Sequence, residues 1–398
     1  MGKRQLTLLG SVTGGHAVIH WHQQLFPLII PQVKAGLGLT DVEVGYFSAA
    51  RQAAVGAANL PSGIIADAWY SRRAVMLAAA LTFMAIAYFL VGIAPSLIWA
   101  LPGAMLVGLG TATWHPPAMA SLSTRFPGRR ATVLAMHGMG ATFSDTLTPI
   151  AFGGLLVLFN WRGVLQMQMI PALLAALIVW RALAGQFKDA PAAPQGGRFR
   201  DVGMLLRNPV FAGVSFAQGL MAMSRNVILT FLPLYIQVDL GYNAFELGLY
   251  IALLHGMGII SQPILGIVAD RFGRKRVLVP SYLAVGVMYL LLVAAAPGWQ
   301  LVLLMLALGV LFYTLTNVTT AAVLDVAGAG VQASSMGLMS VFTQLIALPA
   351  LIAGGWLAEQ MGYGSTFIMS GAFMFAGALL MLPLRMYQGS HKTARFGG

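Results

Sequence analysis

The stretch Gly266–Arg276 reads GIVADRFGRKR and lies between two long apolar segments. A second copy, GIIADAWYSRR at Gly63–Arg73, lies 203 residues earlier and keeps the first glycine, the aspartate and the closing basic pair. A fixed spacing over many positions indicates that the chain is an internal duplication. The residues that share this spacing are Gly38, Glu43, Gly45, Gly63, Ala66 and Asp67, matched by Gly241, Glu246, Gly248, Gly266, Ala269 and Asp270.

The composition predicts an integral membrane protein. Hydrophobic residues make up 58% of the 398 residues and charged residues only 9%, too few to cover a water-facing surface. Apolar stretches of about twenty residues recur, and a helix of that length crosses the roughly 30 Å of bilayer hydrocarbon. The stretches are continuous rather than alternating, so they predict helices and not a barrel. The predicted spans are 11–33, 42–66, 75–94, 97–122, 131–157, 162–183, 210–237, 244–269, 277–296, 299–324, 332–357 and 364–386.

The basic residues predict the orientation of these spans. All but four of the 23 lysines and arginines fall on one side of the membrane if both termini are cytoplasmic. This positive-inside pattern favours a multi-pass protein of the inner membrane with both termini in the cytoplasm. The formal net charge of +12 is thus explained by topology and not by nucleic-acid binding. The first apolar segment has no small-residue cleavage site, so it is expected to be a retained helix.

The chain divides at a linker rich in alanine, proline, glycine and charge. We expect an N-terminal six-helix bundle at 1–184, a cytoplasmic linker at 185–208 and a C-terminal six-helix bundle at 209–398. Parallel repeats of six helices are the build of one large transporter class. The predicted fold is therefore an all-α membrane protein with twelve transmembrane helices in two six-helix pseudo-symmetric bundles.

The sequence at Gly266–Arg276 resembles, in full, the loop signature of the major facilitator superfamily. That resemblance implies a major facilitator fold, in which the loop residues latch the cytoplasmic side of an outward-facing transporter. The charged residues are suited to capping helix ends and pairing with one another, and the glycines to close helix packing. The alternative is a basic loop that only sets topology. The gating residues expected from the resemblance are Gly63, Asp67, Arg72, Arg73, Gly266, Asp270, Arg271, Gly273 and Arg274.

Two further motifs resemble the fosmidomycin-resistance family of exporters. They are Gly108–Pro116, which reads GLGTATWHP, and His137–Pro149, which reads HGMGATFSDTLTP. The resemblance implies export of a solute in exchange for protons.

Two arginines lie within predicted spans, where ionisable side chains are expensive and mark functional paths. Arg51 and Arg225 fall near the middle of their segments, with few acidic partners available. Because guanidinium groups bind carboxylate, phosphonate or nitrate in forked geometry, these residues predict an anionic substrate. The alternative for Arg51 is a structural ion pair with Asp145.

Six of the seven histidines lie within the predicted spans. His16 and His20 share one helix face, whereas His22 points elsewhere. Histidine suits proton coupling or anion binding, although a neutral histidine bonded between helices is the plainer reading. Asp145 and His137 are the predicted proton-coupling residues. The predicted substrate-binding residues are Arg51, Arg225, His20, His115, His255, Asn317 and Gln24.

These features predict a secondary active transporter, and not an enzyme, for a small anionic organic solute. It would work by alternating access, and the family resemblance implies proton-coupled export. Protons and the lipid bilayer are the expected partners, and the monomer is the expected working unit. The alternatives are proton-coupled uptake of a small anion, and a membrane enzyme or metal transporter that uses the membrane histidines. No cofactor or resident metal is expected, because the chain has no cysteine and no nucleotide-binding loop.

Overall fold

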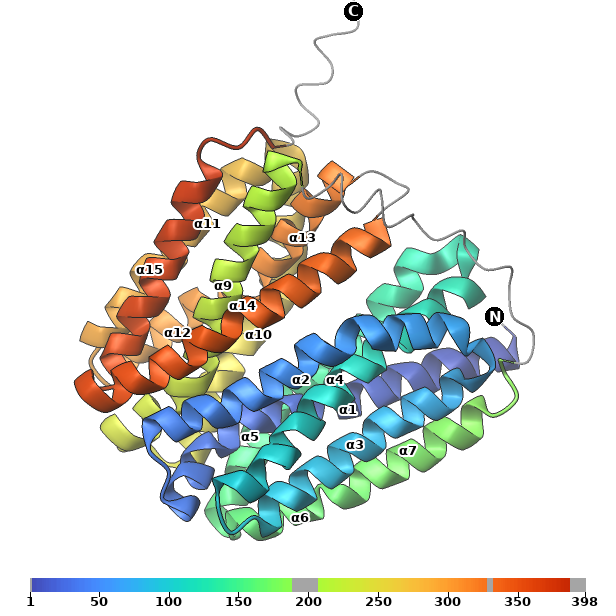
Figure 1. The fold of residues 1–398 in the computed structure, drawn as a ribbon, viewed down its shortest axis with the longest axis horizontal. Coiled ribbons are helices and arrows are strands. Elements are labelled where there is room, and N and C mark those ends of the chain that lie inside the picture. Colours follow the sequence, from blue (N-terminus) through green and yellow to red (C-terminus); the bar gives the residue numbers. More distant parts are fainter. Residues whose placement is uncertain (1, 188–206, 328–331, 387–398) are drawn as a thin grey trace, which may run out of the picture. The chain divides into compact units, whose positions relative to one another are not determined.

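The structure is a computed structural model that describes residues 2–187, 207–327 and 332–386 (Figure 1). In those ranges the chain forms helices and no strand, as the sequence predicts. Most of the predicted linker at 185–208 lies outside the described residues. The final span was predicted to reach 386, but its helix ends at Met381, just before Pro383. The helices before the linker are α1 (Lys3–Leu37), α2 (Asp41–Ala68), α3 (Arg73–Ile93), α4 (Leu97–Arg125), α5 (Arg130–Leu158), α6 (Trp161–Met167) and α7 (Met169–Leu183).

The helices after the linker repeat this series. α9 ends in a π-helical turn at Tyr235–Asp239, and Tyr313 separates α12 from α13 within one predicted span. The later helices are α9 (Pro209–Leu234), α10 (Ala244–Phe272), α11 (Arg274–Ala294), α12 (Trp299–Phe312), α13 (Thr314–Ala327), α14 (Gln332–Met361) and α15 (Tyr363–Met381).

Ten of the described helical segments are long and apolar enough to span a membrane. The first two helices, α1 and α2, fall outside that group although they contain 35 and 28 residues. Several polar side chains lower the mean hydropathy of both helices, because α1 carries three histidines and α2 carries Arg51, Gln52 and Asn59. With α1 and α2 included, the series agrees with the twelve predicted spans.

The described helices form two compact units. The first holds α1 to α7 together with Tyr242–Ala252, and the second holds α9, the rest of α10 and α11 to α15. In the first unit α2 and α3 pack on α4, and α1 packs on α5, around buried Tyr88 and Trp114. In the second unit α9 packs on α14 and α15 around buried Phe231 and Phe367.

Two pairs of repeated residues shape the turns that start α2 and α10. Gly38 and Gly241 have positive φ angles of 66° and 71°, which glycine adopts at little cost. After each turn a capping box starts the helix. The Glu43 carboxylate accepts from the Thr40 amide at 2.9 Å, and Glu246 accepts from the Asn243 amide at 2.8 Å. Part of the sequence repeat therefore encodes equivalent helix boundaries.

Close packing at Gly248 joins the start of α10 to the first unit. A Cβ atom placed there would lie 2.1 Å from the carbonyl oxygen of Pro149 in α5. Gly153, one turn further along α5, is similarly close to the carbonyl oxygen of Ala244, at 2.5 Å. Only glycine permits such contact between helix backbones.

Candidate functional site

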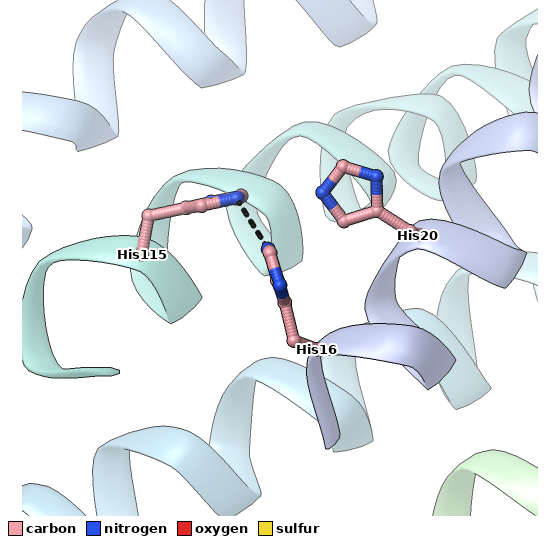
Figure 2. A group of neighbouring side chains, drawn as sticks. All are labelled: His16, His20 and His115. Carbon is pink, nitrogen blue, oxygen red and sulfur yellow. Dashed lines mark hydrogen bonds between the residues drawn. The ribbon is translucent and has the colours of Figure 1, made fainter. Parts of the chain in front are cut away.

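Four histidines from three helices of the first unit meet in what we call the histidine cluster: His16 and His20 of α1, His115 of α4 and His137 of α5. The Nε2 atoms of His16 and His115 are 3.3 Å apart, and the His20 ring lies beside them (Figure 2). His137 stacks on His16 with ring centroids 3.8 Å apart. His16, which the sequence analysis left out of the site, is therefore at the centre of the cluster. Its spacing of four residues from His20 was the available signal.

Asp145 is attached to this cluster. Its Oδ1 accepts hydrogen bonds from His20 Nδ1 and from Gln24 Nε2, each at 2.9 Å. His20 and Asp145 each keep 18% of their side-chain surface exposed, so the pair is half-buried and not fully buried. The structure thus brings together the predicted residues His20, Gln24 and Asp145 from two helices that are far apart in sequence.

His22 lies on another face of α1, as its position in the sequence predicts. Its ring nitrogens contact the carbonyl oxygens of Val18 and Gln168 at 2.8 and 3.2 Å. Tyr88 donates a hydrogen bond to the backbone carbonyl of His22. These contacts fit the plain reading of a histidine that is bonded within the helix packing.

Arg51 lies in α2, where its guanidinium carbon is 5.0 Å from the centre of the Phe26 ring. This distance is within the range of a cation–π contact. Phe26 in turn stacks on Phe47 with ring centroids 4.9 Å apart. The backbone of Arg51 is pressed against α4 at Gly108, where a Cβ atom would lie 2.2 Å from the Arg51 carbonyl oxygen.

Replacing Gly108 with alanine is expected to lower the thermal unfolding midpoint. The added methyl group would also lie 2.9 Å from Ala54 Cβ, and such overpacking costs about 1–3 kcal/mol. Gly10→Ala in α1 is the control, because nothing lies within 4 Å of a Cβ there. Its midpoint should stay the same or rise, since alanine favours helix. Equal midpoints for Gly108→Ala and the wild type would contradict the close approach of α2 and α4.

A second group, which we call the arginine cluster, lies in the second unit and consists of Arg225, Phe312, Tyr313, Thr316 and His255. The Arg225 guanidinium donates to Thr316 Oγ1 at 3.3 Å. Its carbon lies 4.2 Å from the centre of the Tyr313 ring and 5.3 Å from that of Phe312. Tyr313 Oη is 3.0 Å from His255 Nε2, so the predicted residues Arg225 and His255 share one aromatic neighbour.

Asn317 extends the polar surface of the second unit. Its Nδ2 donates to Gln262 Oε1 at 2.9 Å, and one turn earlier Thr314 exchanges a hydrogen bond with Ser261 at 3.1 Å. The contacts join α13 to α10. Thr316 was missed in the sequence analysis, because a single threonine in an apolar segment carries no distinguishing signal.

The two loop motifs form ion pairs in their own units. Arg73 pairs with Asp67 at 3.3 Å and donates to the carbonyl oxygen of Ala66 at 2.9 Å, near the end of α2. Arg274 pairs with Asp270 and reaches Asp325 of α13 at 3.1 Å. The predicted pairing and capping by these charged residues are therefore present.

The remaining motif residues behave differently. Arg72 and Arg271 lie over the rings of Trp69 and Phe272, at 5.7 and 5.5 Å. Gly273 adopts a positive φ of 99°, which allows α11 to begin directly after α10. Within its own unit, neither first glycine makes a close helix contact among the described residues, so its role in helix packing stays a prediction. Within the described residues a Cβ at Gly266 would meet nothing within 4 Å, and one at Gly63 only Pro116 Cβ at 4.0 Å.

Both halves of the chain match a single family model. Residues 12–263 and residues 214–397 each match the model described as the Major Facilitator Superfamily. Together the two matches cover nearly the whole sequence. The chain belongs to the major facilitator superfamily. The predicted superfamily and fold are thereby confirmed, and the narrower resemblance to the fosmidomycin-resistance family stays a prediction.

Curated members of this superfamily that resemble the chain include multidrug efflux proteins. The chain is 27% identical over 171 residues to "Multi-drug resistance efflux pump PmrA" of Streptococcus pneumoniae, with 42% of each chain covered. It is 31% identical over 163 residues to "Multidrug resistance protein MdtG" of Klebsiella pneumoniae, with 39% of each covered. The matches therefore span only about two fifths of these relatives.

Solved structures of transporters share the fold over nearly the full chain. A D-xylose–proton symporter superposes with a TM-score of 0.78 at 14% identity, covering 95% of this chain and 97% of that one. A bacterial homologue of the human lysosomal transporter Spinster superposes with a TM-score of 0.72 at 17% identity, covering 96% and 98%. At such identities the similarity establishes the fold alone.

Proposed function

We propose that the protein is a secondary active transporter that exports a small anionic organic solute across the inner membrane in exchange for protons, by alternating access. The efflux relatives and the motifs that resemble fosmidomycin-resistance exporters support export. The positive-inside pattern supports a cytoplasmic location for both termini. The two six-helix bundles predicted from the sequence, at 1–184 and 209–398, are the proposed domains, and the monomer is the proposed working unit.

The observation that carries the anionic substrate is the setting of Arg225. This guanidinium side chain lies near the middle of α9, where it contacts a neutral hydroxyl and two aromatic rings. Rings and a hydroxyl hold the guanidinium in place without neutralising it. Its fork-shaped donors therefore remain suited to a carboxylate, phosphonate or similar group. His255 and Asn317 are proposed to assist in the same unit, and Arg51, His20, His115 and Gln24 in the first.

The proton-coupling residues we propose are Asp145 and His137. Asp145 is a carboxylate in the middle of α5 that is bonded to His20 and Gln24. Chains of intramembrane carboxylate and histidine side chains form proton relays in pumps and transporters. His137 is buried, and within the described part of the chain its ring nitrogens have no hydrogen-bond partner, so a proton there could pass to or from a mobile group.

The test is transport in proteoliposomes with an imposed pH gradient. A thermal-shift screen of small carboxylates and phosphonates first identifies a solute that stabilises the protein. Export coupled to protons predicts that a proton gradient directed opposite to solute movement drives that solute uphill. Movement of solute and protons in the same direction would instead establish uptake by symport. Stabilisation by cations or neutral sugars, but by no anion, would rule out the proposed substrate class.

Replacing Arg274 with alanine is expected to slow transport by about tenfold, equivalent to about 1.4 kcal/mol in the rate-limiting barrier. The change removes the ion pairs with Asp270 and Asp325 that we assign to gating. Solute binding, measured by thermal shift, should be unchanged, because the arginine cluster is intact. Arg276→Ala is the control, since Arg276 is an exposed residue of the same helix. Equal transport by the two variants would remove Arg274 from the gating machinery.

A further inference from the structure

The ring orientation of three clustered histidines is fixed by oxygen acceptors. His16 Nδ1 contacts the carbonyl oxygen of His137 at 2.9 Å, and His115 Nδ1 contacts that of Thr111 at 2.9 Å. His20 Nδ1 contacts the carboxylate of Asp145 at 2.9 Å. Carbonyl and carboxylate oxygens only accept, so each Nδ1 must carry the proton. In the neutral ring of each histidine, Nε2 is then left with a free lone pair.

Ring nitrogens of the three histidines lie close together. The Nε2 atoms of His16 and His115 are 3.3 Å apart, and one ring nitrogen from each of His16, His20 and His115 lies within 4.8 Å of the others (Figure 2). Tetrahedral zinc with bonds of 2.0–2.1 Å places two ligand nitrogens about 3.3 Å apart. The closest pair already has this separation, and the widest needs a movement of roughly 1.5 Å at most to reach it.

We propose that His16, His20 and His115 form a three-histidine binding site for a divalent transition-metal ion of the zinc class. Ligating histidines in metalloproteins donate their second ring nitrogen to a carboxylate or a backbone carbonyl, and all three histidines here do so. Three imidazoles leave the fourth tetrahedral position open to water or another small ligand. The site goes beyond anion transport, because the ion would join α1 to α4 inside the first unit.

The donor set narrows the class of ion. Neutral imidazole nitrogens suit Zn²⁺, Co²⁺, Ni²⁺ and Cu²⁺, whereas Mg²⁺ and Ca²⁺ prefer oxygen ligands. The chain has no cysteine, so ions that require thiolates are excluded from this site. The Asp145 carboxyl group lies 2.9 Å from His20, and in its ionised form it partly offsets the charge of a divalent ion in the membrane interior.

A shared proton is the competing explanation for the 3.3 Å contact between His16 and His115. A proton bridges only two of the three nitrogens, whereas a metal ion uses all three. If binding depends equally on His16, His20 and His115, the result favours a metal ion over a shared proton. The competing explanation also predicts that metal ions do not bind.

The experiment is metal titration of the full-length protein in detergent, after removal of any affinity tag and treatment with a chelator. Co²⁺ is followed by its visible absorption, which is intense only in tetrahedral sites, and Zn²⁺ by calorimetry and competition with Co²⁺. We expect one ion per chain. His16→Ala, His20→Ala and His115→Ala should each weaken binding by at least about 100-fold, more than the loss of an outer-shell partner.

Two further variants refine the result. Asp145→Asn keeps the ligands but weakens the orientation of His20, so binding should persist at one ion per chain with about 10- to 100-fold lower affinity. His255 lies outside the histidine cluster, so the His255→Gln variant should bind the metal ion as the wild type does. Monodispersity and the metal-free unfolding midpoint verify that each variant is folded. The proposal is overturned if the wild type binds no ion, if the three alanine variants bind normally, or if His255→Gln loses binding as they do.

Discussion

Arg225→Ala is expected to reduce transport of the organic anion at least tenfold, which corresponds to a loss of about 1.4 kcal/mol or more. The guanidinium is the cation of the arginine cluster, and its contacts are with Thr316, Phe312 and Tyr313. Removing the charge leaves a solute anion inside the membrane without its proposed counter-ion, which is a costly state. The measurement is initial transport rate in proteoliposomes, with the apparent solute affinity from thermal shift.

Arg225→Lys separates the charge from the forked geometry. Lysine keeps the positive charge but cannot bind a carboxylate through two parallel hydrogen bonds, so an intermediate loss is expected. Arg181→Ala is the matched control, because Arg181 is an exposed arginine in α7. If Arg225→Ala transports the anion at the wild-type rate, the proposed substrate site is wrong. A fall in unfolding midpoint with normal solute affinity would show that Arg225 acts only in packing against the aromatic rings.

Asp145→Asn is expected to abolish proton-driven transport while exchange of labelled for unlabelled solute continues. Asparagine has nearly the same shape and still accepts a hydrogen bond, but it cannot carry a proton on and off. His20 would also lose a charge-assisted hydrogen bond, which is about twice as strong as a neutral one. The measurement compares uphill transport under a pH gradient with exchange in its absence, at one solute concentration.

Glu359→Gln is the control for this variant, because Glu359 is an exposed acid in α14. It should leave both measurements unchanged. A similar loss of gradient-driven transport and exchange in Asp145→Asn would make Asp145 a structural or substrate-binding residue. Retention of full gradient-driven transport would remove it from the coupling path.

The sequence repeat encodes helix boundaries as well as the loop motif. Glu43 and Glu246 recur because each closes a capping box, and Gly38 and Gly241 recur because each takes a positive φ before it. The histidines and the arginine of the polar clusters lie at positions where the two halves of the sequence differ. Arg225 aligns with His22, a residue bonded to backbone carbonyls, so the same position serves packing in one half.

The loop copy at Gly266–Arg276 and its repeat determined the architecture from the sequence alone. Helix length, apolar composition and capping are local properties, so each span could be located without knowledge of its neighbours. The periodicity of a helix also placed His16 and His20 on one face, apart from His22.

Only the tertiary structure decided which polar side chains meet. His16 contacts His115 across 99 residues of sequence, and His20 contacts Asp145 across 125. Periodicity gives the face of one helix but not the rotation of that face toward another. That rotation is set by packing, such as the contact of Gly108 with the backbone of Arg51. The sequence therefore determined the twelve helices and their duplication, while the histidine and arginine clusters depend on how those helices pack.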